Sequence, residues 1–208
     1  MARKPDLALK KQAKQSRSIA TVTAIVEAGT YILRRGGLTD FTSNKVAERA
    51  GVNVASFYQY FPNKEALLFH IVQRIWEEQF ARLEPILTSS TGSPALRLRT
   101  FVQELMLVEA EEVELRRGLR AASVELRETP EFKAMLARGT TLFHTFLSDA
   151  LGERLPDALD FTIETVTTLI TSFTERATDE ERPKEELLRQ ADFLADLLIT
   201  YFKIYEAV

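Results

Sequence analysis

Cysteine is absent from this chain of 208 residues, and histidine occurs only twice, as His70 and His144. Disulfide bonds and thiolate sites are therefore excluded, and a histidine metal site or a Ser-His catalytic pair is disfavoured. Glycine and proline number only 8 and 7, which excludes collagen-like and low-complexity classes. No apolar run reaches the about 18 uncharged residues of a transmembrane helix, so we expect no membrane span.

The arrangements of residues that enzymes require are also missing. The sequence contains no glycine-rich phosphate loop and no helix with His and Glu at metal-ligand spacing. A basic start before the apolar run 18–26 raises the alternative of a signal peptide. However, Glu27 ends that run, while Val22, Val26 and Leu33 continue a helical spacing beyond it. We expect a cytoplasmic protein that is not an enzyme.

Charge is divided unevenly along the chain. Residues 1–64 carry 11 Lys and Arg against 4 Asp and Glu, whereas residues 65–208 carry 16 against 26. The net charge of -3 thus conceals a basic first part and an acidic remainder. This asymmetry is typical of a small anion-binding module joined to an acidic body, although charged runs are usually only solvated faces.

Apolar spacing predicts an all-α fold throughout the chain. After a basic arm (1–17), we expect a helix over 18–35 that a left-handed residue closes at Gly36–Gly37. Thr42 or Ser43 should cap a short helix to residue 50, Asn53 should cap another over 54–60, and Asn63 should cap a long fourth helix that ends before Pro85. Thr88–Pro94 is predicted as a loop, and further helices are predicted over 95–112, 113–127, 131–151, 157–176 and 184–206.

Residues 42–61 have the pattern of a helix-turn-helix. Ala47 and Ala50 are small enough for close helix approach, Gly51 permits the turn, and Val52 and Phe57 can fill the core beneath it. The exposed face of the second helix would then present side chains to a DNA major groove, namely Val54, Ala55, Ser56, Tyr58, Gln59 and Tyr60. A helical hairpin without a ligand is the alternative that the pattern leaves open.

The segment from Ile19 to Leu68 resembles the DNA-binding domain of the TetR (tetracycline repressor) family. The resemblance rests on the run Val46–Val52 and on the run Phe57–Leu67. It implies a homodimer that binds double-stranded DNA at a palindromic operator and releases it when a small molecule enters the C-terminal domain. The expected division is then an arm (1–17), a helix-turn-helix DNA-binding domain (18–64), and an effector-binding and dimerisation domain (65–208).

The resemblance assigns roles to the start of the first of these two short helices. Thr42 and Ser43 would hold a phosphate with their hydroxyl groups, although Thr42 also suits a plain N-cap. Asn44 would reach a base edge, where an amide pairs well with adenine. Lys45 would meet the DNA backbone.

The second short helix carries the remaining expected contacts. Small or apolar side chains in its first turn let the backbone approach bases and thymine methyl groups; they are Val54, Ala55 and Ser56. Tyr58 and Lys64 match the family's phosphate-binding tyrosine and lysine. Gln59 and Tyr60 follow in the contact set, but Tyr60 replaces the commoner histidine. The basic arm either lies along the DNA or is a solubilising tail.

The acidic body holds the candidate effector pocket. We expect an apolar or aromatic effector, and no cofactor or metal, because phenylalanine is frequent, at 13 residues. The candidate pocket residues are Trp76, Phe80, Phe101, Met106, Phe143, His144 and Phe173. His144 has the alternative of an ordinary core histidine, and the cluster Glu109, Glu111, Glu112 and Glu114 is more typical of a solvated face than of a cation site.

The last two predicted helices are nearly uncharged on two faces, which indicates a subunit interface or a central core. The candidate dimer residues are Ile163, Val166, Ile170, Phe193, Leu197, Tyr201 and Ile204. A ligand-responsive repressor is the function that the sequence favours. An activator or dual regulator, or a helical protein-interaction dimer, are the alternatives.

Overall fold

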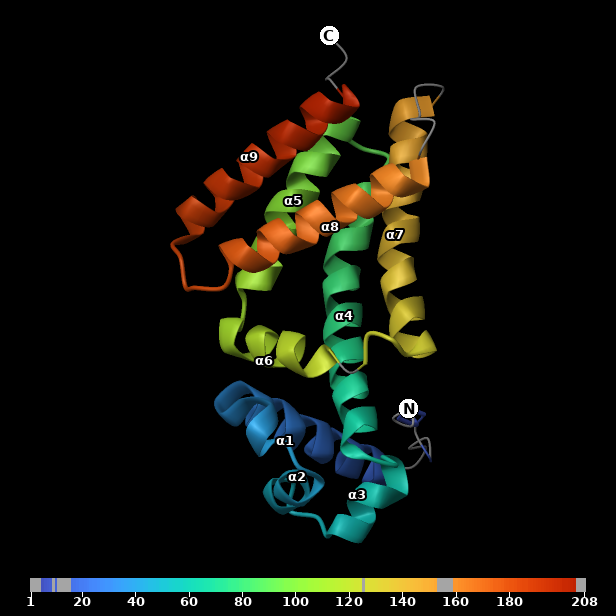
Figure 1. The fold of residues 1–208 in the computed structure, drawn as a ribbon, viewed down its shortest axis with the longest axis vertical. Helices are drawn as coiled ribbons and strands as arrows, with labels where there is room; N and C mark the ends of the chain where they lie inside the picture. Colours follow the sequence, from blue (N-terminus) through green and yellow to red (C-terminus); the bar gives the residue numbers. More distant parts are fainter. Residues whose placement is uncertain (1–4, 9, 11–15, 125, 153–158, 205–208) are drawn as a thin grey trace. The chain divides into compact units, whose positions relative to one another are not determined.

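The computed structural model describes residues 5–8, 10, 16–124, 126–152 and 159–204. Within these residues the regular elements are nine α-helices and no strand (Figure 1). The all-α prediction is therefore confirmed. The helices are α1 (Ser16–Asp40), α2 (Ser43–Arg49), α3 (Val54–Tyr60), α4 (Lys64–Thr88), α5 (Pro94–Ala110), α6 (Val113–Ser123), α7 (Pro130–Leu151), α8 (Leu159–Ala177) and α9 (Lys184–Phe202).

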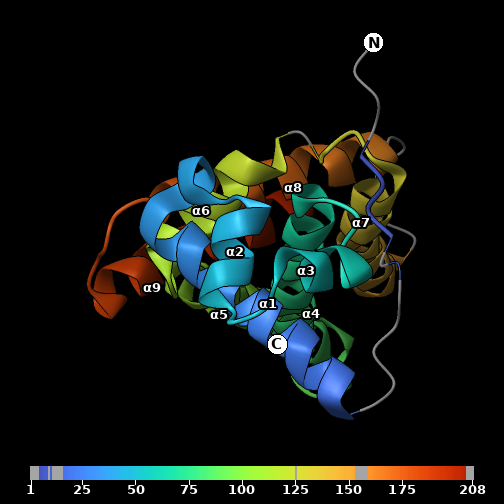
Figure 2. The ribbon, with the colours of Figure 1, turned by 90° about the horizontal axis from the view of Figure 1, so that it is seen from below.

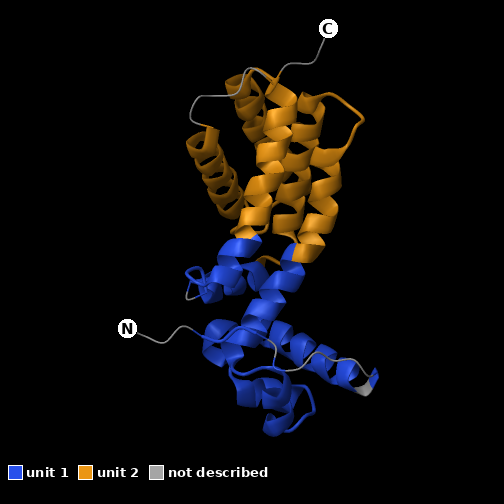
Figure 3. Cartoon of the chain, turned by 90° about the vertical axis from the view of Figure 1, so that its right-hand side faces the viewer, with its two compact units in different colours: residues 1–76, 114–135 blue, residues 77–113, 136–208 orange. Residues whose placement is uncertain are grey.

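The chain divides into two compact units (Figure 3). Unit 1 holds residues 1–76 and 114–135, and unit 2 holds residues 77–113 and 136–208. These bounds differ from the predicted domains, which divide at residue 64. The reason is that Leu67 and Ile71 of α4, and Leu115 and Leu119 of α6, are buried in the same hydrophobic core as α1 to α3.

Unit 1 is built on α1, with α2 packed against α1 and α3 packed against α2 (Figures 1 and 2). The regular part of α1 ends in a kink at Gly37, whose backbone has φ 59° and ψ -157°. Glycine adopts such a positive φ without the cost that a Cβ would impose. Gly118 of α6 has a different reason, because a Cβ there would lie 3.0 Å from the carbonyl oxygen of Leu33. Its missing side chain lets α6 approach the backbone of α1.

Unit 2 has its own core. Aromatic rings of α5 and α7 pack together, with 6.4 Å between the ring centroids of Phe101 and Phe143 and 6.1 Å between those of Phe143 and Phe146. Helix α9 packs against α5, and Arg99 of α5 donates to Asp192 (3.2 Å) and Asp196 of α9. The hydrogen bond to Asp196 raises the pKa of Arg99 above its ordinary value. These ion pairs fix α9 along one side.

The observed helix bounds correct several predictions. Helix α4 does not end before Pro85 but continues to Thr88, because proline's fixed φ suits a helix and only the hydrogen bond from its missing N–H is lost. Helix α6 ends at Ser123 rather than at 127, and α9 ends at Phe202, where Lys203 closes it in the left-handed conformation (φ 53°). The predicted starting residues 157 and 158 of α8 and the predicted final residues 205 and 206 of α9 lie outside the described residues. No helix in the described ranges is both long and apolar enough to cross a membrane.

Candidate nucleic-acid interface

Side-chain caps define the start of both short helices of unit 1, as the sequence predicts. Thr42 is the N-cap of α2, and its Oγ1 accepts a hydrogen bond from the backbone N–H of Lys45 at 3.3 Å. Asn53 is the N-cap of α3, and its Oδ1 accepts from the N–H of Ser56 at 2.6 Å. Each cap satisfies a backbone donor that the helix itself leaves unpaired. The two helices therefore begin at residues fixed by sequence.

The turn between α2 and α3 depends on Gly51, whose φ is +68°. This conformation lets the N–H of Val52 donate to the carbonyl oxygen of Ala47 at 3.0 Å, a helix-ending arrangement that favours glycine. Val46 and Ala47 are fully buried on the inner face of α2. The predicted helix-turn-helix geometry is confirmed.

Helix α3 turns one face inward and another to solvent. Phe57 is fully buried, while Val54 and Tyr58 keep 37% and 42% of their surface exposed. The Tyr58 ring lies edge-on against Phe57, with 5.2 Å between centroids. Ala55 and Gln59 are exposed and Ser56 is half-buried. The outer face of α3 thus combines small side chains with a hydroxyl, an amide and a phenol, which suits contact with base edges and phosphates.

The prediction that Tyr60 lies on this exposed face is wrong. Tyr60 keeps only 7% of its surface and belongs to the core of unit 1. It follows Phe57 by three residues, so the two side chains share one side of the helix. Tyr60 therefore supports α3 from within.

The predicted backbone-contacting lysines are exposed, and each lies near a carboxylate. The Lys45 Nζ is 2.6 Å from Asp40, with 53% of the lysine side chain exposed. The Lys64 Nζ is 4.0 Å from Glu65, with 45% exposed. Exposed pairs of this kind contribute little to stability, so both ammonium groups can exchange these partners for phosphates. Thr42 and Asn44 are exposed and Ser43 is half-buried on the same helix.

A further cation of unit 1 is held by an aromatic ring. The guanidinium of Arg49, at the end of α2, lies 3.2 Å from the centroid of the Tyr31 ring of α1. This cation–π contact ties α2 to α1. The sequence analysis did not single out Arg49, since a cation in the last turn of a helix needs no partner to explain it.

The described part of the N-terminal arm is bound to unit 1, which the sequence analysis did not anticipate. Leu7 is buried, with 5% of its surface exposed. The backbone N–H of Lys10 donates to the carbonyl oxygen of Tyr60 at 3.0 Å, and the Lys10 Nζ donates to that of Tyr58 at 3.3 Å. The only hint in the sequence is apolar Leu7 within a polar stretch.

The candidate effector residues fall into two groups. Met106 and Phe143 are buried in the core of unit 2, and Phe101 and Phe173 pack against it. His144 is half-buried, with its Nδ1 3.4 Å from the Ser148 hydroxyl. The remaining candidate of unit 2 is Phe80, whose ring lies under the Arg138 guanidinium at 4.5 Å. These side chains share unit 2.

Trp76 is the exception. It is the last residue of unit 1 and packs against the core of that unit. The structure thus separates it from the candidates that share the unit 2 core.

The acidic cluster has ordinary partners. Glu109 accepts from Gln79 at 2.8 Å, Glu111 from Arg82 at 2.8 Å, and Glu114 from Arg117 at 3.0 Å. No three His, Asp or Glu side chains within the described ranges are arranged to hold a metal ion.

The candidate dimer residues also divide. Phe193, Leu197 and Tyr201 are exposed to 63%, 44% and 61% and form one stripe of α9. With Asp196 and Thr200 they line an open hollow of ≈ 470 Å³. Such an apolar stripe on the outside of a unit is typical of a binding surface for another protein.

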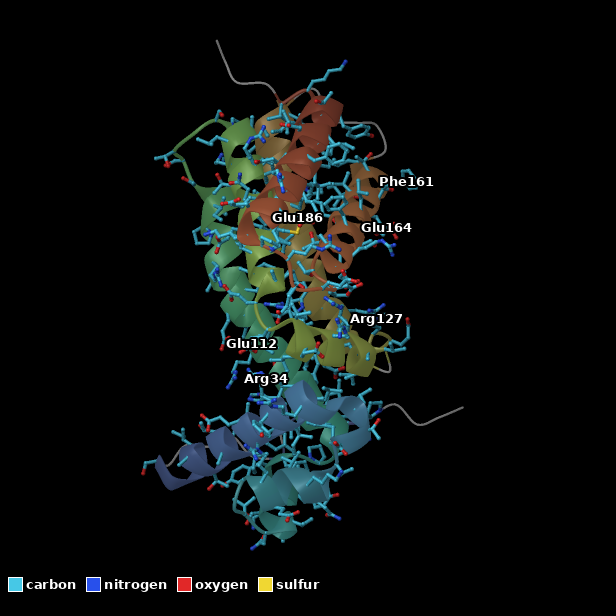
Figure 4. The ribbon with its side chains drawn as sticks, turned by 90° about the vertical axis from the view of Figure 1, so that its left-hand side faces the viewer. Arg34, Glu112, Arg127, Phe161, Glu164 and Glu186 are labelled. Atoms are coloured by element: carbon cyan, nitrogen blue, oxygen red, sulfur yellow. The ribbon has the colours of Figure 1, made fainter. Side chains whose placement is uncertain are left out.

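The other four candidate dimer residues are part of the monomer's own core. They keep 1–5% of their surface; they are Ile163, Val166, Ile170 and Ile204. The prediction that they lie in an exposed interface is therefore wrong, because this face of α8 packs inside unit 2. The exposed face of α8 carries Phe161 (69%) and Leu169 (41%) instead, and Figure 4 shows Phe161 projecting from α8.

Comparison with known proteins agrees with this geometry. Residues 25–71 match the family model described as bacterial regulatory proteins, tetR family. An uncharacterized HTH-type transcriptional regulator of Mycobacterium tuberculosis is 26% identical over 151 residues, which cover 73% of this chain and 68% of the relative.

Solved structures share the fold. A TetR transcription regulator from Haloarcula marismortui has a TM-score of 0.66 at 19% identity, covering 85% of this chain and 97% of its own. The fatty acid degradation regulator FadR from Bacillus halodurans has a TM-score of 0.68 at 16% identity, covering 90% and 97%.

Proposed function

Because residues 25–71 make this chain a member of the TetR family of bacterial DNA-binding transcriptional regulators and not an enzyme, we propose that it is a ligand-responsive repressor acting as a homodimer on a palindromic operator. The observation that carries this proposal is the outer face of α3. Its exposed side chains are small or hydrogen-bonding, while Phe57 and Tyr60 anchor the helix from within. Its place of action is the bacterial cytoplasm, where the DNA is.

The proposed DNA contacts follow from exposure and chemistry. Tyr58 and Lys64 contact phosphates and set affinity, together with Thr42, Ser43 and Lys45. Asn44, Ser56 and Gln59 contact base edges and set preference, while Val54 and Ala55 allow close approach. Two such units would occupy successive major grooves about 34 Å apart.

The proposed dimer surface combines the stripe of α9 with the exposed side chains of α8. Phe193, Leu197 and Tyr201 offer the apolar area that a subunit interface requires. Phe161 and Leu169 extend it on α8. A palindromic operator needs a twofold partner, so the interface and the operator symmetry support each other.

The proposed effector site is the aromatic core of unit 2 around Phe101, Phe143 and Phe173, with Met106 and His144 close in sequence to its walls. An apolar or aromatic molecule suits such a lining. Helix α4 belongs to unit 1 up to Trp76 and to unit 2 from Glu77 on, without interruption. A ligand that prefers one arrangement of unit 2 would therefore bias α4, and only differential affinity between states can achieve this.

Selection of bound sequences from a random duplex pool, with the solution mass determined in parallel, tests the proposal. Recovery of a palindrome by a species of twice 23.6 kDa is expected. Recovery of no motif by a dimer would favour the helical protein-interaction module that the α9 stripe also suits. Transcription from the recovered operator then separates a repressor from an activator.

Substitutions in the contact set give the second test. Lys64→Ala should weaken binding to all duplexes and lower the slope of log K against log salt by about 0.9, because one phosphate contact is lost. Ser56→Ala should instead change the preference among operator variants at an unchanged slope. Unchanged affinity of Lys64→Ala at several salt concentrations would contradict the proposed contacts.

A further inference from the structure

Helix α3 cannot hold its own position. It has seven residues, about two turns, and helices shorter than about 12 residues are marginal in water. Its N-terminal end is capped by Asn53. At its C-terminal end the chain becomes extended at Phe61 (φ -112°, ψ 118°), and the N–H of Phe61 satisfies only the carbonyl of Phe57. The later carbonyl groups need donors from elsewhere.

The N-terminal segment supplies these donors. The N–H of Lys10 bonds to the last carbonyl oxygen of α3, at Tyr60, and its ammonium group bonds to that of Tyr58. A cation at this end of a helix is also favoured by the helix dipole. The same residue thus satisfies two carbonyl groups with two different atoms.

The segment is attached to the next helix as well. Asn63 caps α4 by accepting from the N–H of Ala66 at 2.7 Å through Oδ1. Its Nδ2 donates to the backbone carbonyl oxygen of Asp6 at 2.9 Å. Between these two attachments Leu7 is buried in the core that also contains Phe57 and Phe61. An arm that were only a solubilising tail would make none of these contacts.

We propose that Asp6, Leu7 and Lys10 form a clamp that fixes the direction of α3, and that this clamp sets how well the protein distinguishes its operator from other DNA. The proposal rests on the proposed function in one respect, namely that α3 contacts bases. These three are positioning residues, which act through the backbone of α3 and the corner between α3 and α4. A correctly oriented helix favours the operator, whereas phosphate contacts with any duplex tolerate a less fixed one.

Three variants of the full chain test the clamp. Leu7→Ala removes the buried anchor. Asn63→Ser keeps an oxygen that can cap α4 but removes the amide donor to Asp6, and Lys10→Met removes the ammonium group but keeps the backbone N–H. Ala8→Ser, at an exposed neighbouring position, is the matched control.

Hydrogen exchange of the free protein is the first readout. The amides of α3 should exchange about tenfold faster in Leu7→Ala and Asn63→Ser, while those of α5 and α9 stay unchanged. Ala8→Ser should match the wild type. Unchanged protection of α3 in both variants would overturn the clamp, and this readout needs no DNA.

Affinity for the selected operator and for a scrambled duplex is the second readout. Leu7→Ala should lower the ratio of the two affinities about tenfold, with the salt dependence unchanged. Lys10→Met should show a smaller loss of the ratio, about threefold, also with an unchanged slope. A slope reduced by about one in Lys10→Met would assign Lys10 to a phosphate instead.

The remaining outcomes are also decisive. A lower melting temperature with an unchanged affinity ratio would mean a merely structural segment and would overturn the proposal. If Leu7→Ala does not fold, Asn63→Ser decides. If the wild-type protein does not distinguish the duplexes, the proposed function fails, and the exchange of α3 still tests the clamp.

Discussion

Helices α3 and α9 both expose aromatic side chains, but in different surroundings. On α3 the exposed Tyr58 has Ala55 and Gln59 as exposed neighbours, and the helix has seven residues. On α9, which has 19 residues, Phe193, Leu197 and Tyr201 follow one another every four residues on one stripe. The first pattern is polar around a phenol and suits DNA; the second is continuous and apolar and suits another protein. The neighbours of an exposed aromatic side chain, more than its exposure, therefore indicate its partner.

The strongest way to break this comparison is a charge in the α9 stripe. Leu197→Glu should dissociate the proposed dimer by two orders of magnitude or more, because an unpaired buried charge costs about 3–5 kcal/mol and a twofold interface contains it twice. Sedimentation equilibrium over a range of concentrations measures this. Leu197→Met should remain dimeric, and an unchanged dissociation constant for Leu197→Glu would move the interface away from α9.

The buried side of α3 gives the next largest effect. Phe57→Ala should lower the free energy of unfolding of unit 1 by about 3–5 kcal/mol, since the phenylalanine is fully buried. Trp76 is the sole tryptophan of the chain and packs against the core of unit 1, so its fluorescence during urea unfolding reports this unit. Tyr58→Phe, on the exposed side, should change stability by no more than about 0.5 kcal/mol. Equal losses would mean that α3 has no distinct inner and outer sides.

Local sequence chemistry predicted the helix-turn-helix closely. Thr42, Gly51 and Asn53 each have a reason within three residues of themselves, so the caps and the turn needed no knowledge of the rest of the fold. The position of Tyr60 was also within reach, because its spacing from Phe57 places both on one side of α3. The error there came from weighing the family pattern above the helical period.

What depends on packing between distant segments could not be predicted. Helix α8 has two faces with little charge, and only its packing against α5 and α9 decides that Ile163 is core and Phe161 is exposed. Leu7 is a lone apolar residue in a basic arm, and a single residue has no periodicity to interpret. Its burial follows from the open carbonyl end of α3, which appears only once the corner between α3 and α4 has formed.

The smallest of these effects concerns the start of each helix. Asn53→Ala should destabilise unit 1 by about 1 kcal/mol, because the N–H of Ser56 loses the side-chain acceptor at 2.6 Å. Asn53→Ser should retain most of the stability, and Trp76 fluorescence in urea separates the two. The comparison with α9 is direct: its N-cap, Pro183, makes no side-chain capping bond, so α9 depends on burial along its length. If Asn53→Ala proved neutral, α3 would be held by burial as well, and the short helix would differ from the long one only in its exposed chemistry.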